Sequence, residues 1–367
     1  MEKVFIPRAR DPFDKKVAVY AMVMTLMVVL SHWTHFLPAT NPGTDSRVVE
    51  VINNAYEVYG IVAMTGFFMF SGFMMYYGIE NLRDLYGKIC RRVLSLCIPF
   101  IFWNLFALAY EVAYAIYKGT FGLEMFNLKS LILGFTLAPY NSPMWYLFAL
   151  MMLMLISPVF ALLKNHRGIA AYCFVAVFII SLVVSTLWQG QGVVFLWVRR
   201  LLTYLPLYFL GAWMGLHYSD FIVKEKYHKG ISAVVAAFVF CLISVYFIFF
   251  KQDIQPVNVV LYQSMAPLLW LAVPQALTNR IKISFPMTVY PFAYAMHGVL
   301  ITVIHWLTVR VIMVGHPLPM WADALVQILL VLVLYLVATL VAFIFKLILP
   351  NKVYRIFAGG SAGRKMF

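Results

Sequence analysis

Residues 57–79 read EVYGIVAMTGFFMFSGFMMYYGI, and this stretch decides the class of fold. After Glu57 it contains no charged residue, over more than the roughly 20 apolar residues that a helix needs to cross a bilayer. Gly66, Ser71 and Gly72 are small enough to let a second helix approach closely. We therefore predict a membrane-spanning helix here, with its small residues at a helix contact or at a local backbone distortion.

Apolar runs of comparable length recur along the whole chain. Hydrophobic residues make up 63% of the sequence and charged residues 11%, whereas soluble domains carry about 25% charged residues. In one later run, Gly211 and Gly215 have a spacing that suits helix contact. We predict an all-α bundle of about ten transmembrane helices that forms a single domain over residues 1–367. The other predicted spans are 17–38, 93–117, 143–163, 169–188, 197–216, 230–250, 257–277, 287–314 and 321–349.

The basic residues predict how the bundle is oriented. If the N-terminus lies in the cytoplasm, Lys and Arg on the cytoplasmic side outnumber those on the other side roughly threefold, as the positive-inside rule expects. Both tails, residues 1–16 and 350–367, are then cytoplasmic. The net charge of +14 reflects this topology. Because the basic residues are scattered through short loops, no nucleic-acid partner is predicted.

The longest external connection covers residues 118–142. Its apolar part, residues 128–137, is too short to cross a bilayer. We predict a re-entrant or interfacial segment there, because irregular backbone at membrane depth must be covered by protein. Such a segment is placed to cap a site that opens outward.

Ionisable side chains inside predicted spans are costly, so each is a candidate for function. His32 and His35 are three residues apart near the outer end of the first span, which places them on one helix face. They fit an interfacial pair that faces water or headgroups, a catalytic pair, or half of a metal site. No cluster of Cys, His or acidic residues in the sequence completes a metal site, so none is predicted.

Acidic and basic residues mark opposite ends of the second and third predicted spans. Glu57 and Glu111 lie toward the outer side, where a carboxylate can orient a catalytic histidine or simply be a solvated acid at a helix end. Arg91 and Arg92 stand at the cytoplasmic start of the third span. Arginines there anchor the topology, and two guanidiniums beside free backbone N–H groups also form a phosphate site.

Six short motifs follow one another along the chain. They are His32, FFMFSGFM at 67–74, RRVLSLCIPF at 91–100, NSPMWYL at 141–147, YLPLYFLG at 204–211 and YAMH at 294–297. Taken in order, they resemble the acyltransferase-3 family of bacterial membrane acyltransferases, which O-acetylate sugars of surface polysaccharides and related cell-envelope acceptors. Each motif alone is weakly specific, because apolar helices match one another easily.

The resemblance implies an acetyl transfer across the bacterial plasma membrane by a multi-pass protein. Acetyl-CoA is expected as the donor, bound from the cytoplasm, with no permanently bound cofactor, and a sugar or glycan hydroxyl as the acceptor on the other side. Arg91 and Arg92 are expected to hold the CoA phosphates, and Ser71 to line the path of the pantetheine arm.

The resemblance also assigns the reacting groups. His32 is expected to act as general base on the acceptor hydroxyl or to accept the acyl group transiently, with Glu57 or Glu111 as its carboxylate partner. His297 is expected to orient the acceptor, and His35 and Asn141 to contact it.

Two aromatic residues complete the expected acceptor site. Trp145 and Tyr146 are expected at the outer mouth. Aromatic faces there stack on a sugar, or they belong to the ordinary aromatic belt of a membrane protein.

One position departs from the family pattern. The family carries an Arg eleven residues before the histidine, where this chain has Ala21, or Met24 if His35 is the counterpart. Lys15 and Lys16 lie further toward the cytoplasm. The departure leaves open a catalytically degenerate member that binds partners without turnover. A transporter or flippase of a lipid-linked or small polar substrate also stays open, although no pair of corresponding interrupted segments marks two repeats.

Overall fold

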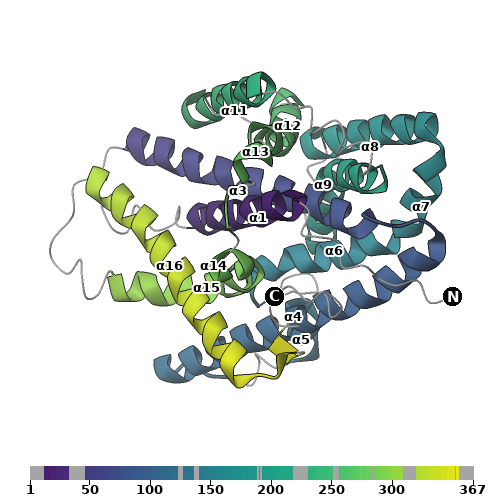
Figure 1. The fold of residues 1–367 in the computed structure, drawn as a ribbon. Coiled ribbons are helices and arrows are strands. Elements are labelled where there is room, and N and C mark those ends of the chain that lie inside the picture. Colours follow the sequence, from purple (N-terminus) through teal and green to yellow (C-terminus); the bar gives the residue numbers. More distant parts are fainter. Residues whose placement is uncertain are drawn as a thin grey trace.

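The computed structural model describes most of the chain, and every regular element in the described part is a helix (Figure 1). The described residues are 12–32, 46–122, 127–135, 140–187, 190, 192–217, 230–250, 256–273, 275–278, 280–282, 284–308, 320–351 and 353–354. The longer helices are α1 (Pro12–Ser31), α3 (Ser46–Tyr76), α4 (Leu82–Lys118), α6 (Trp145–Leu155), α8 (Arg167–Leu187), α9 (Val193–Leu216), α11 (Gly230–Phe250), α12 (Pro256–Ala272), α15 (Tyr290–Leu307) and α16 (Met320–Ile348). The shorter ones are α5 (Leu128–Gly134), η3 (Ser142–Met144), α7 (Ser157–Leu162), η4 (Leu163–Asn165), α13 (Gln275–Thr278) and α14 (Phe285–Thr288).

Six helices in the described part of the chain are long and apolar enough to cross a membrane. They lie within α3, α4, α8, α9, α11 and α16. A seventh span results if the bent pair formed by residues 142–155 and 157–165 crosses as one unit. The all-α membrane bundle is thus confirmed. The total of about ten spans and the cytoplasmic position of both ends stay predictions.

Several helix boundaries differ from the predicted spans, including the start of α4 at Leu82, eleven residues before the predicted residue 93. α1 ends at Ser31, so His32 lies in the turn after the helix and not within it. α3 begins at Ser46, eleven residues before the predicted start at residue 57. The predicted span 143–163 is broken at Ile156 and bends by 53°. Pro158 at the start of α7 explains the break, because a proline has no N–H to continue the hydrogen bonds of α6.

The predicted re-entrant segment contains a short helix. α5 covers Leu128–Gly134, and the side chain of Asn127 caps it by accepting a hydrogen bond from the Ser130 N–H. Seven residues cannot cross a bilayer, as predicted. Whether α5 lies in the membrane or at its surface stays a prediction.

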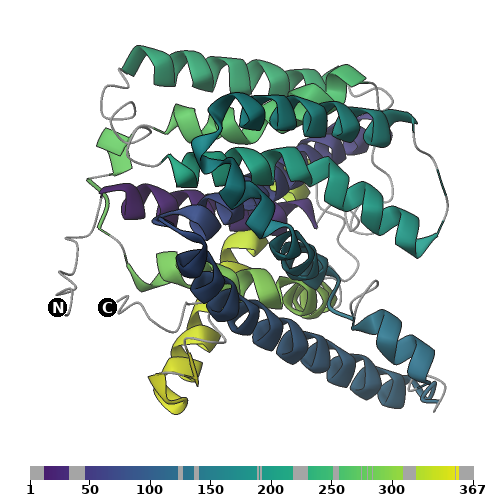
Figure 2. The same cartoon turned by 90° about the vertical axis from the view of Figure 1, so that its right-hand side faces the viewer.

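α1 and α3 occupy the middle of the bundle, as Figure 1 shows. α11 lies on one side of them and the long helix α4 on the opposite side, and the turned view in Figure 2 shows the same order. α3 makes its most extensive contacts with α9 and α1. Away from this centre, large apolar side chains such as Tyr172, Phe238 and Leu336 are exposed on α8, α11 and α16. Such apolar outer faces suit contact with lipid.

The crossing of α3 and α9 depends on glycines, as the sequence predicts. A Cβ atom built on Gly211 would lie 1.7 Å from the Met69 carbonyl oxygen, and one on Gly72 would lie 2.1 Å from the Tyr208 carbonyl oxygen. Gly215 approaches the backbone of α3 in the same way. The two backbones are therefore in direct contact, which no larger residue at these positions would allow.

Two lysines bind the C-terminal end of α3. Lys88 Nζ donates hydrogen bonds to the carbonyl oxygens of Met74 and Tyr77. Lys164 Nζ donates to the carbonyl oxygen of Ile79 at 2.9 Å. A helix leaves its last carbonyl groups without partners, and cations there stabilise both these groups and the helix dipole.

We expect Lys164→Met to lower the free energy of unfolding by about 1 kcal/mol, because the carbonyl groups after α3 lose a charged donor. Thermal unfolding of the purified protein in detergent measures the change. Lys129→Met on the exposed face of α5 is the matched control. Equal unfolding temperatures for the two variants would show that Lys164 does not stabilise α3.

Candidate functional site

Two histidines from opposite ends of the chain meet inside the bundle. His32 follows α1, His297 lies in α15, and their ring centroids are 4.9 Å apart. His297 is fully buried and His32 is half-buried. The pair therefore lies where the C-terminal end of α1 contacts α15. His35 lies outside the described residues.

The hydrogen bonding of His297 defines what its ring can do. Nδ1 lies within hydrogen-bonding distance of the Tyr294 carbonyl oxygen. Because a carbonyl oxygen only accepts, Nδ1 carries the proton, and in the neutral ring Nε2 then has the lone pair. Nε2 is buried and has no hydrogen-bond partner among the described residues. A buried nitrogen of this kind is suited to accept a proton from a bound hydroxyl group.

Ser71 and Tyr146 are joined by a hydrogen bond next to this pair. The Tyr146 hydroxyl donates to the Phe67 carbonyl oxygen at 3.0 Å, so the 2.6 Å contact between the two hydroxyls is a bond that Ser71 donates. The Tyr146 ring lies 5.7 Å from that of Tyr294, which in turn lies 5.4 Å from that of His297. Tyr146 is buried in the core, and its expected place at the outer mouth stays a prediction.

Asn141 fixes the segment before α6 to α15. Its side-chain amide donates to the Ala295 carbonyl oxygen at 2.8 Å, and its backbone N–H donates to the side-chain oxygen of Asn104 at 3.1 Å. The Tyr294 hydroxyl reinforces this contact by donating to the Pro143 carbonyl oxygen at 2.8 Å. Asn141 therefore helps to position the helix that carries His297, and a direct contact with an acceptor stays a prediction.

The two adjacent arginines of α4 have different surroundings. Arg91 is exposed, whereas Arg92 is half-buried. The charge of Arg92 acts on Tyr146, Tyr208 and Tyr290, which belong to three different helices. Arg92 is therefore partly covered by the bundle and lies within electrostatic range of these tyrosines.

The two carboxylates predicted to assist a histidine are exposed. Glu57 lies on α3, where its charge acts on Tyr262 of α12. Glu111 lies on α4 beside Tyr110. The structure thus groups His32, His297, Ser71, Tyr146, Asn141 and Arg92, and it places Glu57, Glu111 and Arg91 on exposed surfaces. The catalytic role of either carboxylate stays a prediction.

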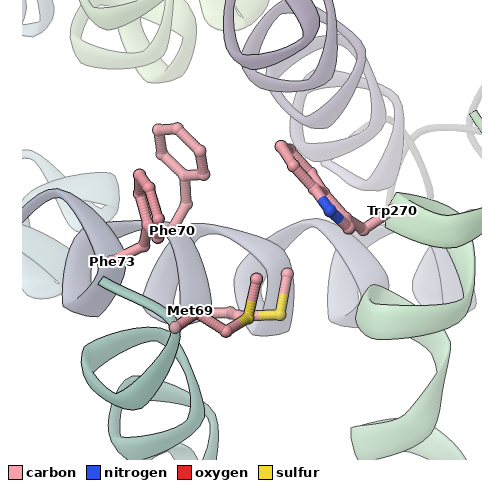
Figure 3. A pocket seen from close by; sticks show the side chains of 5 residues that line it. Met69, Phe70, Phe73 and Trp270 are labelled. Atoms are coloured by element: carbon pink, nitrogen blue, oxygen red, sulfur yellow. The ribbon is translucent and has the colours of Figure 1, made fainter. Parts of the chain in front are cut away.

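Lys16 lies deeper than the sequence suggested. Its side chain is fully buried, and Nζ lies 4.1 Å from the centroid of the Trp270 ring. The same tryptophan lines a small apolar pocket between α3, α9 and α12, whose other lining residues are Met69, Phe70, Phe73 and Met214 (Figure 3). Ala21 and Met24 are also buried in the core, so the position of the family arginine serves packing in this chain.

Sequence reasoning missed Tyr294 and Arg200. Tyr294 joins Tyr146 to His297, and its position one helical turn before a histidine was the available signal. Arg200 lies 4.9 Å from the ring of Trp145, which is half-buried and also packs against Phe68 and Tyr204. An arginine inside an apolar run could have been singled out by the same argument as the histidines.

A bundle of apolar helices that encloses a histidine pair and a buried tyrosine row is a multi-pass membrane protein with an internal polar site. Its family follows from comparison with known proteins. The family model described as "Acyltransferase domain" matches residues 22–347, which is nearly the whole chain. The chain therefore belongs to the acyltransferase-3 family and is a membrane acyltransferase. No curated protein and no solved structure matched it.

Proposed function

We propose that the protein moves an acetyl group from acetyl-CoA in the cytoplasm to a hydroxyl group of a sugar or cell-envelope glycan outside the bacterial plasma membrane. One observation carries the proposal. Aromatic residues form a continuous row from the neighbourhood of Arg92, through Tyr146 and Tyr294, to His297 and His32. The row leads from Tyr146, which lies within electrostatic range of a cation suited to phosphate, to imidazoles suited to acyl transfer.

Arg92 supplies the donor end of this arrangement. CoA carries phosphate groups, which a guanidinium binds through two parallel hydrogen bonds. Partial burial among tyrosines strengthens such a charge interaction relative to one in bulk water. Arg91 is exposed next to it and contributes only long-range attraction, which salt screens.

The histidine pair supplies the reacting end. A hydroxyl proton of the acceptor passes to an imidazole Nε2 while the hydroxyl oxygen bonds to the thioester carbonyl carbon. The carbon–sulfur bond then breaks, and the proton passes to the departing thiolate to give CoA and the acetylated acceptor. If His32 first accepts the acetyl group, its ring nitrogen bonds to the thioester carbonyl carbon as the carbon–sulfur bond breaks and the thiolate leaves. In a second step the acceptor oxygen loses its proton and bonds to that carbon, and the carbon–nitrogen bond to His32 breaks.

Ser71 and Tyr146 fix two of the helices that surround the aromatic row. Their hydrogen bond ties α3 to α6, and the bond from Tyr146 to the Phe67 carbonyl oxygen adds a second tie. We assign them the positioning of the row between donor and histidines, since the Tyr146 proton is already donated within the bundle.

The adjacent arginines provide a matched test of donor binding. We expect Arg92→Gln to raise the KM for acetyl-CoA by about tenfold to a hundredfold, because a bidentate phosphate contact is lost. Arg91→Gln should change it less than about threefold. The measurement is release of CoA thiol from acetyl-CoA by each purified variant. An equal change of the KM for acetyl-CoA in both variants, or an unchanged KM in Arg92→Gln, would contradict the assignment of Arg92 to donor binding.

A further inference from the structure

A second interior cation lies apart from the proposed donor route. The guanidinium carbon of Arg200 on α9 lies 4.9 Å from the centroid of the Trp145 ring and 5.8 Å from that of Trp197. The two indole rings meet edge to face at 6.4 Å. Trp197 is buried, and Trp145 and Arg200 are half-buried. The cation is thus held between α6 and α9 by aromatic rings.

The hydrogen-bonding capacity of Arg200 is unused. It makes no hydrogen bond and no ion pair with any residue in the described part of the chain. Cation–π contacts stabilise its charge but leave the N–H donors of its planar edge without partners. Arg199 differs, because its Nη2 donates to the Ser185 carbonyl oxygen at 3.1 Å and so ties α9 to α8. Arg200 alone of this adjacent pair is placed to bind an anion.

The position of Arg200 distinguishes it from the donor site. Tyr208, on which the charge of Arg92 acts, lies eight residues further along α9, which is about 12 Å at 1.5 Å per residue. Between Arg200 and Tyr208 along α9, Tyr204 stacks on Phe68 with ring centroids 4.6 Å apart, and Phe68 contacts Tyr146. Arg200 therefore contacts a part of the aromatic core about 12 Å along α9 from the tyrosine on which the charge of Arg92 acts.

We propose that Arg200, Trp145 and Trp197 form a site for an anionic group, a carboxylate or a phosphate, carried by the acceptor sugar. The guanidinium edge binds the anion through parallel hydrogen bonds. The half-buried Trp145 ring offers an apolar face to the sugar ring. The identity of the ligand as the acceptor rests on the proposed function, whereas the anion site itself does not.

The test measures binding without catalysis, so it is independent of acetyl transfer. The full-length protein is placed in nanodiscs of phosphatidylcholine and titrated with methyl β-D-glucuronide, glucose 1-phosphate and the neutral methyl β-D-glucoside. Tryptophan fluorescence reports binding next to the two indoles. We expect at least one of the two acidic sugars to bind about tenfold or more tightly than the glucoside.

Variants of the two adjacent arginines then show which of them causes the preference for acidic sugars over the glucoside. Arg200→Gln should abolish it, while Arg199→Gln should keep it. If Arg200→Gln does not fold, Arg200→Lys should fold and reduce the preference, because an ammonium cannot bind bidentately. Equal binding of all three sugars would overturn the proposal. So would a preference for the acidic sugars that Arg200→Gln retains or that Arg200→Lys leaves undiminished. Loss of binding when phosphatidylglycerol is added would assign the site to a lipid headgroup and overturn it equally.

Discussion

Replacing His32 by Ala is expected to lower acetyl transfer by about a hundredfold to ten-thousandfold, because the reacting hydroxyl loses an imidazole at the end of the aromatic row. Acetylation of envelope glycans, followed by mass spectrometry in cells that carry each variant, measures the effect. Ala removes the ring that packs against His297 at 4.9 Å but leaves Arg92 in place. Binding of CoA to the purified variant should therefore be nearly unchanged.

A second variant separates chemistry from packing at this pair. His32→Gln retains a polar side chain of similar reach against His297 but cannot shuttle a proton at neutral pH. It should be as inactive as His32→Ala and should unfold near the temperature of the native protein. Full acetylation by either variant at normal protein levels would refute the role of His32.

Replacing Gly211 by Leu is expected to abolish the folded bundle. Even a Cβ atom there would lie 1.7 Å from the Met69 carbonyl oxygen, so α9 must move away from α3 along their whole contact. The stack of Phe68 on Tyr204 and the pocket by Met214 would be lost with it. We expect destabilisation of about 4 kcal/mol or more, the range reached when a close-packed core is disrupted.

The measurement for Gly211 is the yield of monodisperse protein in detergent and its unfolding temperature. Gly168→Leu in the first turn of α8 is the matched control, because no atom lies within 4 Å of a Cβ built there. We expect the control to behave like the native protein. A Gly211→Leu variant that purifies and unfolds as the control does would contradict the close contact between α3 and α9.

The class of fold and the presence of close helix contacts at the glycines of α3 and α9 could be predicted from sequence because both depend on local composition, whereas the pairing of these two helices was not predicted. An apolar run longer than the bilayer thickness dictates a spanning helix, and small residues such as Gly72 and Gly211 dictate close contact. Helix ends were harder to predict. His32 lies beyond the last turn of α1, and no residue in the surrounding apolar run signalled that boundary.

The candidate site was less predictable because its contacts join distant parts of the chain. Nothing local to His32 and His297 indicates that their rings meet. Arg91 and Arg92 are identical residues next to each other, and only the packing of α4 decides which one faces inward. Tyr146 resembled a residue of the interfacial belt, yet its hydroxyl is satisfied inside the core by Ser71 and Phe67.

Transfer of labelled acetyl groups across a sealed membrane tests the central claim most directly. Inverted vesicles present the cytoplasmic face outward and can be supplied with acetyl-labelled acetyl-CoA. We expect label to accumulate on sugar-containing material inside vesicles that carry the native protein, and we expect Arg92→Gln and His32→Ala vesicles to accumulate little. Absence of label inside native vesicles, or equal accumulation with His32→Ala, would contradict the central claim.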